Sequence, residues 1–247
     1  MIEFHAVQTP NAMKVSIMLK ELNLPYELID YDIPAGDHLA PKFRKLNPNN
    51  RLPVIRDMDS KDGDGPVTVF ESGAILIYLA EKSGQLLSHD LRVRTLTQQW
   101  LMWQMAAFGP MSGQLGHFLR HCPQDEPYSV KRYADEVERL LDVLEYRLVE
   151  AEFLAGDYSI ADIAVWPVAV ALSFLGVNVT SRSASNRWLT AIATRNTVPE
   201  VTKATLEAIA LRADYKAKED LTREQWSNIF GHKYLAAARP RSQVRPK

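Results

Sequence analysis

The sequence is poor in cysteine, because Cys122 is the single one among 247 residues. A lone cysteine excludes an internal disulfide and a Cys-x-x-Cys redox pair within the chain. No apolar run approaches the roughly 18 residues of a membrane-spanning helix, so we expect no membrane partner. An excess of one charge is also lacking: 29 basic and 30 acidic residues leave a formal net charge of -1. This balance gives no indication of a nucleic-acid or membrane-surface partner.

A basic segment followed by an apolar run is missing at the start, where Met1–Glu3 opens a strand-like run. We therefore expect no secretory signal and a cytoplasmic location. The composition, with 46% hydrophobic and 24% charged residues, is ordinary for a soluble globular protein. A chain of this length is expected to bury a sizeable core in one or two domains.

The most informative pattern lies between Asn50 and Ala80. Two short apolar runs, Leu52–Ile55 and Val67–Phe70, flank a turn-rich segment that contains two Asp-Gly pairs. This pattern predicts a hairpin. Pro53, at the head of the first run, cannot donate to a sheet ladder, so it marks an edge, a bulge or a cis peptide bond.

Glu71 and Ser72 follow the hairpin and lead directly into an apolar helical run, Ala74–Ala80. Glu and Ser are favourable residues at a helix start, and the free backbone N–H groups of that start favour an anion. One short stretch therefore offers both a donor cluster and a carboxylate acceptor, a combination that suits a zwitterionic ligand.

The segment before this pattern has the order strand, helix, strand. Thr9 and Pro10 mark the helix start, with Thr as the N-cap and Pro in the first turn. Together with the hairpin and its helix, the order becomes β-α-β followed by β-β-α. That order is typical of a thioredoxin-like domain, which we expect to end near Gly84. The first three elements are expected at Ile2–Ala6, Met13–Leu22 and Tyr26–Asp32.

The second half of the chain has helical periodicity from Arg94 onward. Ser159 and Asp162 form a variant of the capping box at the head of a helix that is apolar nearly all round, which predicts the buried centre of a helical domain. A bend is expected at Gly109–Pro110. The remaining helices are expected at 128–150, 185–195, 198–212 and 221–238, and a basic, proline-bearing tail at 239–247 is expected to be disordered.

Three motifs resemble one known family. L-P-V-I from Leu52, followed by F-E-S-G-A-I-x-x-Y-L from Phe70, closely resembles the glutathione-binding half of the glutathione transferases. T-P-N-x-x-K from Thr9 and the string W-L-M-W-Q-M-A-A-F-G-P-M-S-G-Q-L-G-H-F from Trp100 are similar to the nu class of that family. The resemblance covers about residues 1–212.

This resemblance implies the glutathione transferase fold. It consists of a thioredoxin-like α/β glutathione-binding domain at 1–85, an all-α helical bundle domain at 93–212 and a homodimer with its site in the cleft between domains. Residues 213–247 are an extension beyond the resemblance, partly helical with a basic tail. Its apolar residues are expected to pack across the helical domain and narrow the cleft.

The resemblance also implies a glutathione site. The residue before a cis-proline, here Leu52 before Pro53, pairs through its backbone with the cysteinyl unit of glutathione. Glu71 accepts the ammonium of the γ-glutamyl end, and Ser72 with the helix start accepts its carboxylate. Thr9 and Asn11 face the sulfur, although both also suit the first turn of a helix.

The resemblance implies three further glutathione contacts, at positions where another role is also open. The nu-class residue at the glycyl end of glutathione is typically Gln, and here it is His38, for which a solvated loop position is the alternative. Asn50 is another candidate for the same end. Arg132 is expected to reach the γ-glutamyl carboxylate, across the dimer interface, unless it is only a solvated helix residue. Met111, Gln114 and Phe118 are candidates for the cleft wall over the sulfur.

His117, His121 and Cys122 invite a zinc interpretation, because histidines four residues apart share a helix face. A fourth ligand or an open catalytic partner is not evident, so we expect no metal. Cys122 lies on the far side of the domain linker from the Thr9 loop, and we do not expect it to be catalytic.

The resulting prediction is a glutathione-dependent disulfide-bond oxidoreductase, in which glutathione itself supplies the thiol. One alternative is a transferase or peroxidase that acts on electrophiles or organic hydroperoxides, because it would share the glutathione site. The other is a non-enzymatic binding or regulatory protein on the same scaffold. For both enzymes glutathione is the expected co-substrate and small-molecule disulfides or electrophiles are the expected partners, whereas a carrier that had lost the site would not bind immobilised glutathione.

Overall fold

The structure is a computed structural model of the chain, and it describes residues 1–60, 63–211 and 221–238. The expected basic tail at 239–247, the whole of 212–220 and the Asp62 position of the predicted turn lie outside these residues. Within the described ranges, no helix combines the length and apolar character needed to cross a membrane.

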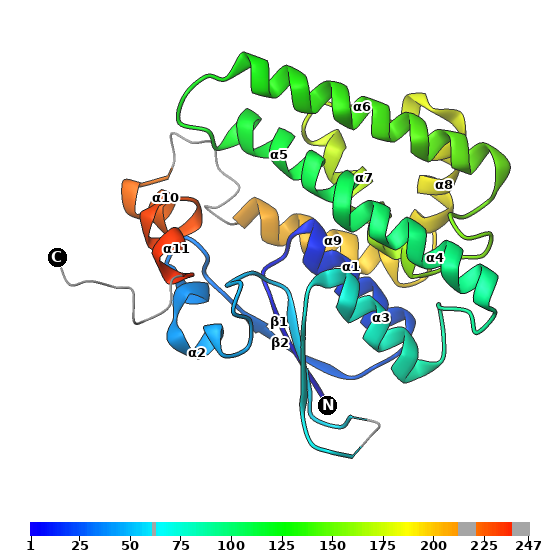
Figure 1. The fold of residues 1–247 in the computed structure, drawn as a ribbon, viewed down its shortest axis with the longest axis horizontal. Helices are drawn as coiled ribbons and strands as arrows, with labels where there is room; N and C mark the ends of the chain where they lie inside the picture. Colours follow the sequence, from blue (N-terminus) through cyan, green and yellow to red (C-terminus); the bar gives the residue numbers. More distant parts are fainter. Residues whose placement is uncertain (61–62, 212–220, 239–247) are drawn as a thin grey trace.

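The N-terminal half is a four-stranded mixed sheet with helices, as predicted (Figure 1). The strand order is β2-β1-β3-β4, in which β1 runs parallel to β2 and antiparallel to β3, and β3 pairs antiparallel with β4. This is the β-α-β then β-β-α order of a thioredoxin-like domain. The elements are β1 (Ile2–Ala6), α1 (Pro10–Glu21), β2 (Tyr26–Asp30), β3 (Val54–Asp57), β4 (Val67–Phe70) and α3 (Ser72–Ser83).

Helix α1 begins as the sequence predicts. Thr9 has extended backbone angles and its Oγ1 accepts a hydrogen bond from the Ala12 N–H at 3.3 Å, while Pro10 occupies the first helical position. A side-chain cap and a proline together satisfy the start of the helix, because proline has no N–H to leave unpaired. The N-terminus of α1 is therefore fixed at the end of β1.

The connection between β2 and β3 is an ordered loop containing η1 (Asp37–Leu39) and α2 (Pro41–Arg44). Asn47 organises it: the Asn47 Nδ2 donates to the carbonyl of Arg51 at 2.7 Å, and its Oδ1 accepts from the N–H of Asn49 at 2.8 Å. The Asn50 Nδ2 donates to the His38 carbonyl at 2.7 Å. These side-chain bonds to the backbone replace a sheet ladder and hold both ends of the loop together.

The C-terminal half is all helical, with α5 and α6 lying side by side along one edge of the molecule (Figure 1). Its buried centre is α7, whose Ser159–Asp162 capping box is formed as expected. The elements are α4 (Leu91–Trp103), η2 (Gln104–Phe108), α5 (Gly109–Arg120), α6 (Pro127–Glu150), α7 (Ile160–Ser173), η3 (Val179–Ser181), α8 (Ser183–Ala193) and α9 (Val198–Leu211).

The irregularity expected at Gly109–Pro110 lies one turn earlier, where η2 is a π-helix. The Gly109 N–H donates to the carbonyl of Gln104, five residues back. Pro110 has no N–H to continue a regular α-helical ladder, so the turn before it widens. A Cβ at Gly109 would stand 2.6 Å from the Gln104 Nε2 and 3.1 Å from the Gln104 carbonyl oxygen, so a side chain here would displace the Gln104 amide.

One hydrophobic core joins the two halves. Buried side chains of α1, such as Ile17 and Met18, belong to the same cluster as Leu76 of α3 and Ile163 of α7. Helix α1 packs on both α7 and α9. The N-terminal sheet and the helical bundle are therefore joined through a buried apolar interface.

The expected helix at 221–238 is instead two short helices, α10 (Arg223–Ile229) and α11 (His232–Ala237). The chain turns between them at Gly231, where a Cβ would lie 2.8 Å from the Ser227 Cα and 2.9 Å from the Trp226 ring. Only glycine fits so close an approach. Both helices lie near α2 and beyond the end of α5 (Figure 1).

Candidate functional site

A cleft of about 450 Å³ brings together every residue expected to contact glutathione except Arg132, while Met111, Gln114 and Phe118, the candidates for the wall over the sulfur, are not among its lining residues. These residues come from four segments that are distant in the sequence: the start of α1, the β2–β3 loop, the turn before β3 and the start of α3. They are Thr9, Asn11, His38, Asn50, Leu52, Pro53, Glu71 and Ser72. A second cavity of about 540 Å³ shares Asn11 and Glu71 and extends to Gln104 and Gln114 of the helical half.

The turn before β3 contains a cis peptide bond between Leu52 and Pro53, one of the three alternatives that the sequence left open. Strand β3 begins only at Val54. The Leu52 backbone thus stands ahead of the sheet ladder, in the cleft wall, where an extended ligand backbone has room to pair with it.

The start of α3 has no cap from the side chain of its own N-cap residue. That residue is Glu71, which precedes the helix with a φ of 70°. A φ in this region is uncommon for a residue with a side chain and costs on the order of 1–3 kcal/mol. Ser72 is buried, with 3% of its surface exposed. Uncapped N–H groups beside a serine hydroxyl form a favourable environment for an anion.

Thr9 and Asn11 flank Pro10 at the start of α1. Because the Thr9 Oγ1 accepts from the Ala12 N–H, its hydroxyl hydrogen points away from the helix start. Asn11 is exposed and lines three neighbouring cavities. The two side chains offer hydrogen-bond donors at the junction of these cavities.

His38 is a buried residue of the cleft wall, 3% exposed, which contradicts the alternative of a solvated loop histidine. Burial lowers the pKa of His38 to about 4, with a smaller lowering from the Arg51 charge, so the ring is neutral near pH 7. Within the described residues, the Nδ1 atom is buried without a hydrogen-bond partner.

Three residues of the site were not identified from the sequence. Lys14, within T-P-N-x-x-K, is fully buried and lies under Ser72. Arg51, directly before Leu52, donates from Nε to the Tyr234 hydroxyl at 2.8 Å, and its guanidinium lies 4.7 Å from the centre of that ring. Lys14 lies within a motif and Arg51 directly precedes one, and Tyr234 belongs to the extension that was expected to narrow the cleft, but none of the three was singled out as a site residue.

Tyr234 belongs to the C-terminal segment, which reaches both halves of the protein. Its ring lies 6.4 Å from that of His38, and Asn228 donates to the Pro34 carbonyl at 2.7 Å. At the other end, the Trp226 Nε1 donates to the His121 carbonyl at 3.2 Å. The segment thus borders the cleft, as expected of the extension, and bridges the β2–β3 loop to α5.

Comparisons with known proteins agree with this geometry. Models of the glutathione S-transferase N-terminal and C-terminal domains match residues 9–82 and 127–192. The disulfide-bond oxidoreductase YfcG of Escherichia coli is 43% identical over 209 residues, which are 84% of this chain and 96% of that protein. The chain belongs to the glutathione S-transferase family.

Solved members of the family share the fold. A glutathione transferase from Burkholderia graminis, with two glutathione molecules bound per subunit, is 42% identical with a TM-score of 0.78, over 82% of this chain and 88% of that one. One from Pseudomonas putida, with one glutathione disulfide bound per subunit, is 40% identical with a TM-score of 0.75, over 82% and 90%.

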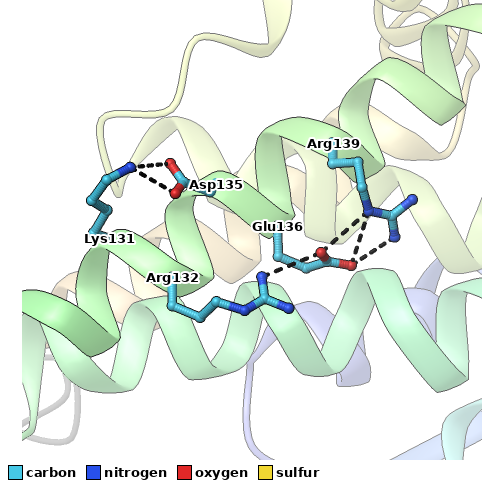
Figure 2. Close-up of polar contacts among 5 residues, drawn as sticks. All are labelled: Lys131, Arg132, Asp135, Glu136 and Arg139. Carbon is cyan, nitrogen blue, oxygen red and sulfur yellow. Dashed lines mark hydrogen bonds and ion pairs between the residues drawn. The ribbon is translucent and has the colours of Figure 1, made fainter.

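Arg132 is the one expected glutathione contact that does not line the cleft of its own chain. It lies on α6 with its side chain 55% exposed, and its Nη1 donates to the Glu136 Oε2 at 3.3 Å (Figure 2). Arg139 holds the other oxygen of Glu136 at 2.6 Å. This is an ordinary surface ion pair between residues four apart on a helix. The proposed cross-subunit role of Arg132 stays a prediction.

His117 of α5 and His121, which directly follows this helix, pack against an aromatic ring. The Phe230 ring lies 4.9 Å from His117 and 5.1 Å from His121. In the described parts of the chain, no three His, Cys, Asp or Glu side chains are arranged to hold a metal ion. Phe118, a candidate for the cleft wall, instead stacks on Tyr133 at 5.6 Å.

Proposed function

We propose that this protein is a glutathione-dependent disulfide-bond reductase. The observation that carries the proposal is one cleft in which Thr9 and Asn11 adjoin the Leu52–Pro53 turn and the uncapped start of α3. The name of YfcG as a disulfide-bond oxidoreductase supports it, as do relatives solved with two glutathiones or with glutathione disulfide.

The reaction is thiol–disulfide exchange. The thiolate of one glutathione attacks a sulfur of the substrate disulfide, a new S–S bond forms, and the other sulfur leaves as a thiolate that takes a proton. A second glutathione then attacks the mixed disulfide, which yields glutathione disulfide and the second substrate thiol. Glutathione provides both electrons, so no cysteine of the chain takes part.

Thr9 and Asn11 act on the attacking sulfur. A free thiol titrates near about pH 8.5, and hydrogen bonds to its thiolate lower that pKa. Each unit of lowering corresponds to about 1.4 kcal/mol. In the proposal both side chains donate to the glutathione sulfur and hold it beside the cavity that receives the second sulfur.

The rest of the glutathione binds along the cleft. Leu52 pairs through its backbone with the cysteinyl unit after Pro53, Glu71 accepts the γ-glutamyl ammonium and Ser72 donates to its carboxylate. His38 and Asn50 face the glycyl end, with the neutral His38 ring as a hydrogen-bonding group rather than a cation.

A homodimer in the cytoplasm completes the proposal. Arg132 would reach the γ-glutamyl carboxylate of the glutathione bound to the partner subunit. It would first have to release Glu136, and breaking an exposed ion pair costs little free energy. Light scattering tests this directly, and a monomer would contradict the cross-subunit role of Arg132.

A second candidate function is conjugation or reduction of apolar electrophiles by the same thiolate. It is favoured by a mainly apolar cavity of about 360 Å³ that adjoins Asn11. Its wall includes Gly113, Gly116, Leu172 and Phe230. Glycines on this face of α5 leave room for an apolar substituent.

The deciding experiment measures reduction of a small mixed disulfide by glutathione, coupled to glutathione reductase, beside conjugation of an aryl halide. Fast reduction with weak conjugation supports the reductase, and the reverse supports the transferase. Absence of both activities, together with failure to bind immobilised glutathione, would contradict both enzymes.

Asn11→Ala tests the sulfur contact. Loss of a hydrogen bond to a charged group costs about 1.5–3 kcal/mol, so we expect the rate of disulfide reduction to fall roughly 10- to 150-fold. Asn186→Ala, at an exposed position of α8, is the matched control and should retain the full rate. An Asn11→Ala protein with unchanged rate and affinity would remove Asn11 from the site.

A further inference from the structure

The side chain of Lys14 is fully buried beneath the start of α3, where its amine contacts neutral groups. Its Nζ donates to the Gln104 Oε1 at 2.9 Å and to the Ser72 Oγ at 3.5 Å, and lies 3.9 Å from the Met105 Sδ. All three acceptors are neutral. Among the described residues, none of the carboxylates forms an ion pair with it. Burying an uncompensated ammonium is expensive, and such groups are seldom kept for packing alone.

The charged state of Lys14 is finely balanced. Burial lowers the pKa of Lys14 to about 7, and the negative charge of Glu71 opposes this lowering. Glu71, at the head of α3, is the charged group whose field acts on the amine. The π-helix η2 contributes the neutral Gln104 and Met105. Arg51 and His117 line the same 540 Å³ cavity, and burial lowers the pKa of His117, which favours its neutral form.

We propose that Lys14 is a positioning residue that orients the Ser72 hydroxyl toward a ligand carboxylate and takes up a proton when that carboxylate binds. The inference rests on the proposed function, because the carboxylate is the γ-glutamyl one of glutathione. A hydroxyl has one hydrogen and two lone pairs. The Ser72 hydroxyl donates to the Met105 Sδ, 3.8 Å away, and accepts from Lys14 at 3.5 Å. Because Lys14 occupies one lone pair, the hydroxyl can meet a ligand carboxylate only by turning its hydrogen from this weak acceptor toward the cleft.

Proton uptake follows from the same contacts. A carboxylate bound at Ser72 brings an opposite charge to within a few ångströms of the amine, which favours its charged form. The pKa of Lys14 therefore rises on binding, and a proton enters from solvent wherever the free amine is neutral. By linkage, ligand affinity should decline as the pH rises above about 7.

The test is isothermal titration with S-methylglutathione, a ligand without a titrating thiol, in buffers of different ionisation heat. From a pKa near 7, we expect uptake of about 0.1 proton near pH 6, about 0.5 near pH 7 and about 0.9 near pH 8. The amine of the ligand also titrates, so the decisive quantity is the difference between the wild type and Lys14→Met.

Lys20→Met is the matched control, because Lys20 lies on the same helix but pairs with Glu200 at the surface, 2.7 Å away. Lys20→Met should keep the full proton uptake, and Lys14→Met should lose it. Near pH 6, Lys14→Met should also bind S-methylglutathione roughly 10- to 100-fold more weakly. In the disulfide assay its KM for glutathione should rise by a similar factor with little change in kcat, as for a contact made equally in the ground and transition states.

The outcomes separate the two proposals. A wild-type protein that does not bind S-methylglutathione at any pH would overturn the glutathione site itself. Binding without proton uptake, or uptake that survives in Lys14→Met, would overturn the role of Lys14 and leave the glutathione site standing. If Lys14→Met fails to fold, proton uptake by the wild type and by Lys20→Met near pH 7 and 8 still tests the proposal. A site in which no protein group gains a proton on binding would show only the small contribution of the ligand amine.

Discussion

Helix α8 is capped by a carboxylate from another helix, and removal of that carboxylate should weaken the bundle. Glu145 of α6 accepts hydrogen bonds from the N–H groups of Ala184 and Ser185 at 3.0 and 2.7 Å, and from the Ser185 hydroxyl at 2.7 Å. Arg182, the local N-cap residue, makes no side-chain cap of its own. The first turn of α8 therefore depends on a residue about 40 positions earlier.

The magnitude follows from two terms. Loss of an N-cap acceptor costs about 0.5–2 kcal/mol, and loss of a negative charge at a helix N-terminus costs about 0.3–1 kcal/mol. We expect Glu145→Ala to lower the free energy of unfolding by about 1–3 kcal/mol. For a chain of this size, that corresponds to a fall in Tm of about 2–10 °C.

Thermal and urea unfolding followed by circular dichroism measure this effect. The control is Glu138→Ala, because Glu138 lies on the same helix and pairs with Arg182 at an exposed position, 2.8 Å away. A surface ion pair contributes about 0–1 kcal/mol, so Glu138→Ala should change the Tm little. Equal Tm values for the two variants would refute capping across the two helices.

The capping effect should also depend on pH. Burial alone would raise the pKa of Glu145, but the hydrogen bonds from Ala184 and Ser185 outweigh it and hold that pKa below its usual value of 4.5. The stabilisation is therefore present above about pH 4.5 and is lost as the pH falls through the lower folded value. The difference in stability between wild type and Glu145→Ala should shrink in acid.

Two further predictions follow from contacts between the halves. Glu21→Gln should destabilise the protein by about 1–2 kcal/mol near pH 7, measured by urea unfolding, because Glu21 accepts two bonds from Arg195 and one from Thr197 at 2.7–2.9 Å. Burial raises the pKa of Glu21, but the hydrogen bonds outweigh burial and the net pKa lies below its usual value of 4.5. The stability difference between wild type and Glu21→Gln should therefore fade below about pH 4.5, and a difference that persists in acid would contradict this. Gly109→Ala should weaken S-methylglutathione binding several-fold in titration, because its Cβ displaces the Gln104 amide from its place; unchanged affinity would show that Gln104 can move freely.

The parts of the fold that were predictable depend on local chemistry. Thr9 and Pro10 at a helix start, and Ser159 with Asp162 at another, act within a few residues of themselves, so the sequence alone reveals them. The residues that line the cleft could be named in advance because Leu52–Pro53 and the Glu71 region form contiguous motifs, whereas their contacts with glutathione stay a prediction. Such motifs predict where a cleft lies without any knowledge of packing.

What was missed depends on contacts between distant segments. From the sequence alone Lys14 resembles an exposed helix residue, but in the folded protein α3 and η2 cover it. The irregularity lies one turn before the expected bend at Gly109–Pro110, because Pro110 lacks the N–H that a regular helix would use there. The split at Gly231 results from the Trp226 ring, whose position depends on α5. None of these has a signal at the spacing of a helix or a strand.

The continuous core between the sheet and the helical bundle has a consequence for how this protein varies and unfolds. Since Ile17, Leu76 and Ile163 share one buried cluster, the boundary between the two family domains runs through close-packed side chains rather than through a linker. A change of side-chain volume in α1 has to be absorbed by α7, so substitutions on the two sides should be coupled in double-mutant cycles. The two domains are separate in topology, but because they share one core we expect them to unfold together as a single cooperative unit.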